Sequence, residues 1–275
     1  MLIGQLSDLH VCCSEGLAAK NRFAERAIAA IARLRPDVVI LTGDVTECGT
    51  REEYELVVRM LSPLDAPVYA IPGNHDDRDV MRSVFPPLDG RTGGPLNVLV
   101  ESRPLRLIGL DSTIPGRVEG ALSGPTLDFL DEALSREPDV PALVFLHHPP
   151  IAIGVEGKDG IRLFEGADRL AALVARHRQV ERVGAGHFHR NLQARFGGTI
   201  CQIAPPVRYM TPAERGDPYD HELDDEPPGF LLHRWIEGSG LVTHLCPIPL
   251  TDRAAPRRVG ADVTRASVKT VLEGG

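Results

Sequence analysis

The chain lacks the features that would place it in or across a membrane. None of its apolar stretches approaches the ~20 residues of a membrane-spanning helix. Its first residues, Met1–Leu6, carry no basic segment and leave no room for the apolar part of a secretory signal. We therefore expect a cytoplasmic protein with no membrane span.

Cysteine pairs and clustered positive charge are also scarce. The 5 cysteines form no Cys-x-x-Cys motif, and their odd number argues against a disulfide framework in a chain of 275 residues. The formal net charge is −8, and no predicted helix carries a cluster of Lys and Arg. Because binding to a nucleic-acid polymer needs concentrated positive charge, we expect no such partner.

Short apolar runs alternate with helical patterns in the first half of the chain. Strands are expected at 2–6, 38–41 and 68–71, and helices at 21–34 and 51–61. The periodicity of the second helix predicts that Tyr54, Val58 and Leu61 share its buried side. Alternation of strand and helix is typical of an α/β protein whose largely parallel sheet is covered by helices.

The second half supplies further strands and two helices, followed by polar segments. Strands are expected within 96–111 and at 142–146, 180–185, 191–196, 199–203, 230–236 and 241–246, and helices at 125–136 and 166–177. We divide the chain into a core at 1–204, an acidic cap or lid loop at 205–229, C-terminal strands at 230–250 that complete the fold, and a peripheral tail at 251–275. The acidic loop is interpreted either as a lid or subunit contact or as a solvated surface excursion.

Polar side chains follow the predicted strands at the points where the strands end. They are Asp8, His10, Asp44, Asn74, His75, His147, His187 and His189. The carboxyl ends of parallel strands meet at one edge of a sheet, where ligands bind in open α/β folds. Asp8 and His10 are two residues apart, as are His187 and His189, so in extended backbone both side chains of each pair would point to the same side. Glycine beside Asp44, Asn74 and His187 would allow close backbone approach.

Without His75, this set offers two Asp, one Asn and four His as metal ligands. Seven donors are too many for one tetrahedral site but suit two sites that share a ligand. Asp44 is the natural bridge because a carboxylate has two oxygens. The mixture of nitrogen and oxygen donors favours Fe, Mn, Zn or Co over Mg or Ca. The alternative is a chance collection of polar loop residues and helix caps.

The charge of such a site indicates a class of substrate. Two divalent ions, two aspartates and a bridging hydroxide leave one net positive charge. That charge matches the single negative charge of a phosphodiester, although a phosphomonoester stays open as an alternative.

Five blocks of sequence resemble those of the calcineurin-like metallophosphoesterases in order and spacing. They read Asp8-Leu9-His10, Gly43-Asp44, Gly73-Asn74-His75-Asp76, His147-His148 and Gly186-His187-Phe188-His189. His147-His148-Pro149-Pro150 and Asp217-Pro218-Tyr219 are similar to the bacterial branch that includes cyclic-nucleotide phosphodiesterases and glycerophosphodiesterases. The resemblance implies a four-layer αββα sandwich of two mixed sheets with a small C-terminal cap, and a homo-oligomer of two or more chains.

The resemblance also implies roles for these residues. One ion would be held by Asp8, His10, Asp44 and His189, and the other by Asp44, Asn74, His147 and His187. Asn74 would lie close to the phosphate, and His75 would contact it or protonate the leaving group; a supporting role for His75 beside Asp44 is the alternative. A water or hydroxide that bridges the two ions with Asp44 would attack in line.

The implied function is metal-dependent hydrolysis of small phosphodiesters, either cyclic nucleotides or glycerophosphodiesters. Protein phosphatases of the superfamily read Gly-Asp-x-x-Asp-Arg-Gly, and that arginine is absent from Gly43–Gly49. The alternatives are a phosphomonoesterase or nucleotide phosphatase, a nuclease, which the acidic charge disfavours, and a metal-binding scaffold without catalysis. Arg91, Arg117 and Lys158 are candidates for substrate contact.

Overall fold

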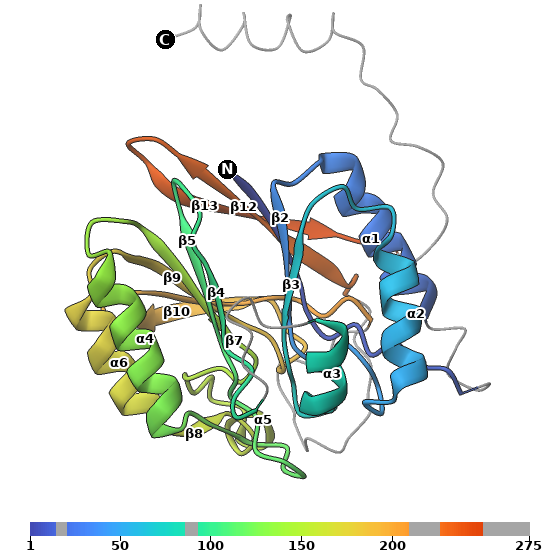
Figure 1. Ribbon diagram of the computed structural model, residues 1–275, viewed down its shortest axis with the longest axis horizontal. Coiled ribbons are helices and arrows are strands. Elements are labelled where there is room, and N and C mark those ends of the chain that lie inside the picture. The colour runs from blue at the N-terminus through green and yellow to red at the C-terminus, as the bar shows by residue number, and fades with distance from the viewer. Residues whose placement is uncertain (15–20, 86–92, 209–225, 250–275) are drawn as a thin grey trace, which may run out of the picture.

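Two mixed β-sheets and their covering helices form four layers in the computed structural model (Figure 1). The structure describes residues 1–14, 21–85, 93–208 and 226–249. The predicted tail at 251–275 lies outside these residues, as does most of the predicted acidic loop. The αββα sandwich expected from the sequence is confirmed.

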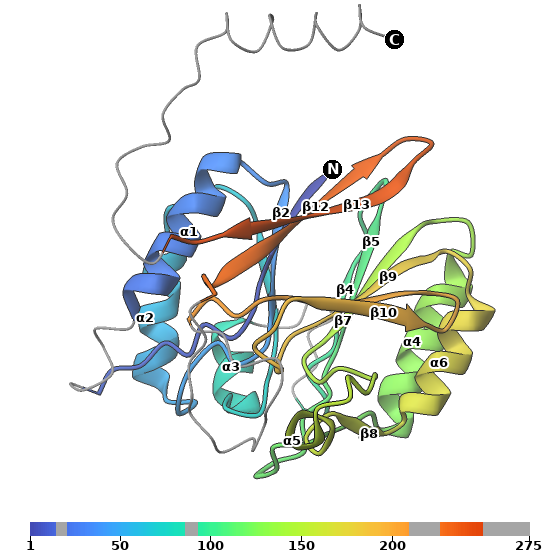
Figure 2. The same ribbon diagram turned by 180° about the vertical axis from the view of Figure 1, so that it is seen from behind.

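The first sheet has the strand order β13-β12-β1-β2-β3. Its strands are β1 (Leu2–Leu6), β2 (Val38–Thr42), β3 (Val68–Ile71), β12 (Gly229–Ile236) and β13 (Gly240–Pro247). β1, β2 and β3 are parallel, whereas β12 pairs antiparallel with β1 and β13 pairs antiparallel with β12. The C-terminal hairpin therefore lies beside the N-terminal strand within this sheet (Figure 2).

The second sheet has the order β10-β11-β9-β7-β5-β4. Its strands are β4 (Val98–Val100), β5 (Arg106–Leu110), β7 (Ala142–Leu146), β9 (Val180–Ala185), β10 (Leu192–Phe196) and β11 (Thr199–Ile203). The four inner strands are parallel, and the edge strands β4 and β10 are antiparallel to their neighbours. A separate parallel pair joins β6 (Gly120–Ala121) to β8 (Leu163–Glu165).

Helices cover the outer face of each sheet, as the opposite sides of Figure 1 show. The helices are α1 (Arg22–Leu34), α2 (Arg51–Leu61), α3 (Arg78–Val84), α4 (Gly124–Arg136), α5 (Glu156–Asp159) and α6 (Ala167–Arg176). The first three pack on the first sheet, and α4 and α6 pack on the second. Within the part of the chain described here, no helix combines the length and apolar character needed to cross a bilayer.

Two apolar clusters lie between the helices and the outer faces of the sheets, and a third lies between the two sheets. It joins Ile3, Ile40 and Ile71 of the first sheet to Leu107 and Phe145 of the second, and all five side chains are fully buried. Burial of each such side chain stabilises the fold by about 1.5–3 kcal/mol. This packing fixes the two sheets face to face, so that the ends of their parallel strands meet.

The helix α2 shows where a periodicity argument went wrong. Tyr54 and Leu61 are buried as predicted, but Val58 is 46% exposed and the neighbouring Val57 is buried instead. At 3.6 residues per turn, Val57 lies near the middle of the apolar stripe of this helix, whereas Val58 lies at its edge. The short helices α3 and α5 and the strands β6 and β8 were not predicted.

A capping box fixes the start of α2. Thr50 accepts a hydrogen bond from the backbone N–H of Glu53 (3.4 Å), and the Glu53 carboxylate accepts from the N–H groups of Thr50 (3.3 Å) and Cys48 (2.9 Å). Such reciprocal caps satisfy donors that the first helical turn leaves unpaired. The loop that joins β2 to α2 is held in place by these bonds.

Replacing Thr50 with Ala should lower the free energy of unfolding by about 1 kcal/mol, because Glu53 N–H loses its acceptor. Denaturant unfolding followed by circular dichroism measures this loss. The Thr50→Ser variant keeps the hydroxyl and should unfold like the wild type. A serine variant as unstable as the alanine variant would contradict the capping role.

Candidate metal centre

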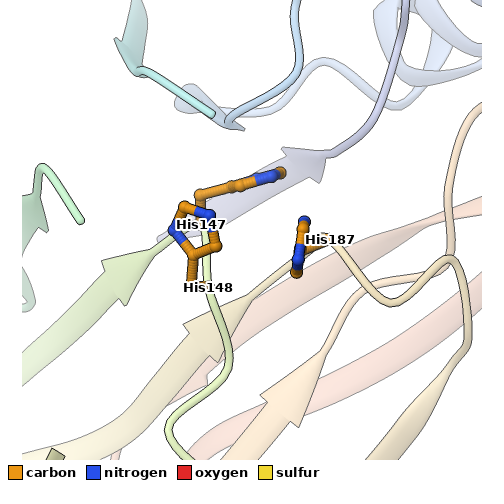
Figure 3. Close-up of side chains that lie close together, drawn as sticks. All are labelled: His147, His148 and His187. Carbon is orange, nitrogen blue, oxygen red and sulfur yellow. The ribbon is translucent and has the colours of Figure 1, made fainter. Parts of the chain in front are cut away.

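The carboxyl ends of five parallel strands meet in one region at the edge of the two sheets. Asp8 and His10 follow β1, Asp44 follows β2, Asn74 and His75 follow β3, His147 follows β7, and His187 and His189 follow β9. Figure 3 shows the imidazoles of His147, His148 and His187 gathered where β7 and β9 end. The structure therefore brings together all eight side chains singled out in the sequence.

The backbone at five of these residues is left-handed, not extended. The φ angles are 54° at Asp8, 46° at His10, 47° at Asp44, 68° at His187 and 51° at His189. The expectation that each Asp-x-His or His-x-His pair lies on extended backbone is therefore wrong. Hydrogen bonds from Asp8 N–H to Gly43 O (3.1 Å) and from His10 N–H to Asp44 O (2.9 Å) hold this loop conformation. Positive φ is uncommon outside glycine and tends to occur at functional sites.

Two glycines allow the loops to approach one another, as the sequence predicted. A Cβ atom on Gly73 would lie 2.2 Å from Oδ1 of Asp44. A Cβ atom on Gly43, whose φ is +89°, would lie 2.3 Å from Nδ1 of His147. Any side chain at either position would displace one of these polar groups from the centre.

One half of the site consists of Asp8, His10 and His189. Their ligand atoms all lie within 4.8 Å of one another. The Nε2 atoms of His10 and His189 are 3.2 Å apart, and Nε2 of His189 is 3.3 Å from Oδ1 of Asp8. All three residues are buried, so a cation held here would be shielded from bulk water.

Asp44 lies between this half and the other. Its Oδ2 atom is 3.7 Å from Nε2 of His10 and 3.3 Å from Nε2 of His147. The other oxygen, Oδ1, accepts a hydrogen bond from the backbone N–H of His75 (2.9 Å). One carboxylate thus faces imidazoles from both halves of the site.

The second half contains Asn74, His147 and His187. Oδ1 of Asn74 is 3.3 Å from Nε2 of His147. The ring centroids of His147 and His187 are 4.9 Å apart. Two imidazoles and an amide oxygen therefore lie together here, and His147 joins them to Asp44.

Hydrogen bonds to the main chain determine which nitrogen of each imidazole could bind a cation. Nδ1 of His147 donates to the carbonyl of Thr42 (2.8 Å), and Nε2 of His187 donates to the carbonyl of Ile161 (3.0 Å). Because a carbonyl only accepts, these nitrogens carry the protons. His147 would therefore bind a metal through Nε2, and His187 through Nδ1.

The adjacent His148 is engaged at both ring nitrogens. Its Nδ1 bonds to the Ser112 hydroxyl (2.8 Å), and its Nε2 donates to the carbonyl of Val118 (3.1 Å). It is buried beside His147 and His187 but has no nitrogen to offer a metal without breaking these bonds. These bonds give His148 a structural role.

The electrostatics of the centre favour a cation. Burial raises the pKa of Asp8 and of Asp44, but the neighbouring imidazoles of His189 and His147 outweigh it and lower both values. Burial lowers the pKa of His147, and the Asp44 carboxylate more than reverses this, to about 9. Burial and the rings of His148 and His147 hold the pKa of His187 well below its ordinary value. Transition metals bind to ionised carboxylates and to neutral imidazole nitrogens. The buried aspartates and the imidazole of His187 supply donors of both kinds.

His75 differs from the ligand set because its side chain is exposed. Its Nδ1 donates to the carbonyl of Glu47 (2.9 Å), which leaves Nε2 as the nitrogen that can exchange a proton with a bound molecule. Its ring centroid is 4.7 Å from that of His10.

Three further charged residues support the centre and were missed in the sequence. Asp76 accepts hydrogen bonds from the N–H groups of Val45 and Gly73 (both 3.0 Å) and joins the loops after β2 and β3. Glu47 lies against His10 and Arg208, and these two side chains hold its pKa at about 2. Only Asp76 had a signal, because it follows His75 directly.

The structure describes two of the three residues that were predicted to contact substrate. Arg91 lies outside the described residues. The side chain of Arg117 is 65% exposed and forms an ion pair with Glu119 at 3.2 Å. Lys158 is buried, which lowers the pKa of its ammonium group.

Known proteins that are similar to this chain provide evidence of its family. A family model described as calcineurin-like phosphoesterase matches residues 1–191. A relative from Arcobacter nitrofigilis, named "Probable glycerophosphodiester phosphodiesterase", is 37% identical over 252 residues, which cover 89% of this chain and 92% of the relative. The 3′,5′-cyclic adenosine monophosphate phosphodiesterase CpdA of Pseudomonas aeruginosa is 31% identical over 242 residues, covering 86% of this chain and 85% of the relative.

The fold has a solved counterpart in a dimetal phosphatase from Danio rerio. The TM-score is 0.60 at 15% identity, and the match covers 90% of this chain and 99% of that one. This likeness bears on the fold alone. The family model and the two relatives bear on descent, and the resemblance seen in the five sequence blocks is confirmed. The chain belongs to the calcineurin-like phosphoesterase family.

Proposed function

We propose that the chain hydrolyses small phosphodiesters, either cyclic nucleotides or glycerophosphodiesters, at a binuclear transition-metal centre. Calcineurin-like phosphoesterases use such a centre, and relatives of this chain are named as phosphodiesterases of both kinds. The observation that carries the proposal is the place of Asp44, one oxygen of which faces both His10 and His147.

The proposed ligand sets follow the two halves of the site. Asp8, His10, Asp44 and His189 would hold one ion, and Asp44, Asn74, His147 and His187 would hold the other. The nitrogen and oxygen donors suit Fe, Mn, Zn or Co. When bound, a metal pair lowers the pKa of a coordinated water and offsets charge on the phosphoryl oxygens.

The protein's own residues position the substrate and move a proton. Asn74 is half-buried at the mouth of the second half, where its amide can also reach a phosphoryl oxygen. His75 is exposed beside His10, with Nε2 turned away from its bond to Glu47. Protonated at both nitrogens, His75 can donate the Nε2 proton to a departing alkoxide.

Net charge favours a diester over a monoester. A diester carries one negative charge, which matches the single positive charge expected for two divalent ions, two carboxylates and a hydroxide. The arginine that grips phosphate in protein phosphatases is absent from Gly43–Gly49. Homo-oligomerisation and a cytoplasmic location stay predictions from the sequence.

The proposal is tested by comparing a diester with a monoester. The Mn²⁺-loaded protein should hydrolyse bis(p-nitrophenyl) phosphate with higher kcat/KM than p-nitrophenyl phosphate, and chelation should abolish both activities. The release of p-nitrophenol measures the rates. Preference for the monoester would indicate a phosphomonoesterase, and turnover of neither would indicate a metal-binding scaffold.

Replacing Asn74 with Ala should empty the second site and reduce kcat, because an oxygen donor beside His147 is lost. Loss of a residue that hydrogen-bonds to a ligand typically weakens metal binding by about 10- to 100-fold. Loss of a ligand itself should weaken the binding of one ion by more than that. Metal content after gel filtration measures the effect. Asn74→Asp keeps an oxygen donor and should retain two ions, and full metal content in the alanine variant would refute the assignment.

Replacing His75 with Ala should leave both ions bound but slow the reaction by about 10²–10⁴-fold, the usual contribution of a general acid. The loss should be largest for diesters with poor leaving groups, since these need the proton most. A series of phenyl diesters of increasing phenol pKa measures this dependence. Equal loss across the series would show that His75 only supports the site.

A further inference from the structure

The histidines of the centre differ in what holds their outer nitrogen. His147 and His187 donate to the main-chain carbonyls of Thr42 and Ile161. His10 instead turns its Nδ1 toward a side chain, with Oε2 of Glu47 at 3.4 Å. A carboxylate behind a ligating imidazole fixes the tautomer and ring orientation and raises the basicity of the ligand.

Glu47 is itself held by a buried arginine. Nη1 of Arg208 contacts Oε2 of Glu47 and also donates to the backbone carbonyl of His10 at 3.0 Å. Arg208 is only 5% exposed although it lies 161 residues from Glu47 in the chain. The segment before it is anchored by a hydrogen bond from Val207 N–H to Ser7 O (3.0 Å). The guanidinium therefore joins the side chain of Glu47 to the main chain of His10.

The backbone of Glu47 connects the same residue to the proposed general acid. Its N–H donates to Val11 O (3.0 Å), and its carbonyl accepts from Nδ1 of His75 (2.9 Å). A single residue thus contacts the imidazole of a proposed metal ligand through its side chain and that of His75 through its main chain. A shift of Glu47 would move both rings.

We infer that Glu47, held by Arg208, is a positioning residue that orients His10 for the first metal site and keeps His75 in register with it. This inference rests on the proposed function. An ordinary surface ion pair contributes little to stability and would leave metal binding unchanged. The burial of Arg208 and its second bond to His10 O set this pair apart from such a contact.

The test titrates the metal-free, full-length protein with Mn²⁺ by calorimetry and measures metal retained after gel filtration. Wild-type protein should retain two ions. Glu47→Ala should bind one of them about 10- to 100-fold more weakly and retain close to one. Glu47→Gln, whose amide oxygen can face Nδ1 of His10 without the negative charge, should lie between the two.

Arg208→Gln should weaken the binding of the same ion. The loss of binding free energy in the double variant should be smaller than the sum of the losses in Glu47→Ala and Arg208→Gln, because both residues act through His10. Additive losses would overturn the shared role. Glu52→Ala on α2 and Arg195→Gln on β10, both at exposed positions, are matched controls and should retain two ions.

Three outcomes would contradict a positioning role for Glu47. Glu47→Ala with two ions bound as tightly as in the wild type would overturn the inference, as would loss of both ions with a lower Tm of the metal-free protein. A Glu47→Gln variant no better than Glu47→Ala would also contradict it. Wild-type protein that binds no Mn²⁺ would instead contradict the proposed function.

Discussion

The site depends on the burial of two carboxylates among imidazoles. Asp8 and Asp44 are almost inaccessible to water, and an ionised carboxylate in such a place must be paired. The neighbouring imidazoles of His189 and His147 offset the burial of these carboxylates in the metal-free protein. A pair of cations would satisfy the same carboxylates, so the arrangement that is costly without metal becomes favourable with it.

The fold keeps this arrangement by opposing the strain of its loops. Five of the proposed ligands have positive φ, and each such residue costs on the order of 1–3 kcal/mol. The apolar cluster between the sheets and the hydrogen bonds between the loops after β1 and β2 offset this cost. Asp76 adds a connection between the loops after β2 and β3. Rigid parallel strands on both sides thus leave the ligands little freedom to relax.

The partners behind the ligands differ in how substitution can change them. Main-chain carbonyls hold His147 and His187, so side-chain changes at Thr42 and Ile161 would leave those bonds in place. His10 faces the side chain of Glu47, which a single substitution can alter. Substitutions can therefore change the metal affinity of the first half of the centre more directly than that of the second half.

The sequence by itself determined the strands of the two main sheets, most of the helices and the eight polar residues at strand ends, and its resemblance to a known family implied the layered fold. It could do so because apolar runs and turn residues act locally, and because parallel strands bring their carboxyl ends to one edge. Tertiary structure alone decided that the ligand loops are left-handed. It alone brought Arg208 to Glu47, because contacts between distant segments depend on packing that no local pattern encodes.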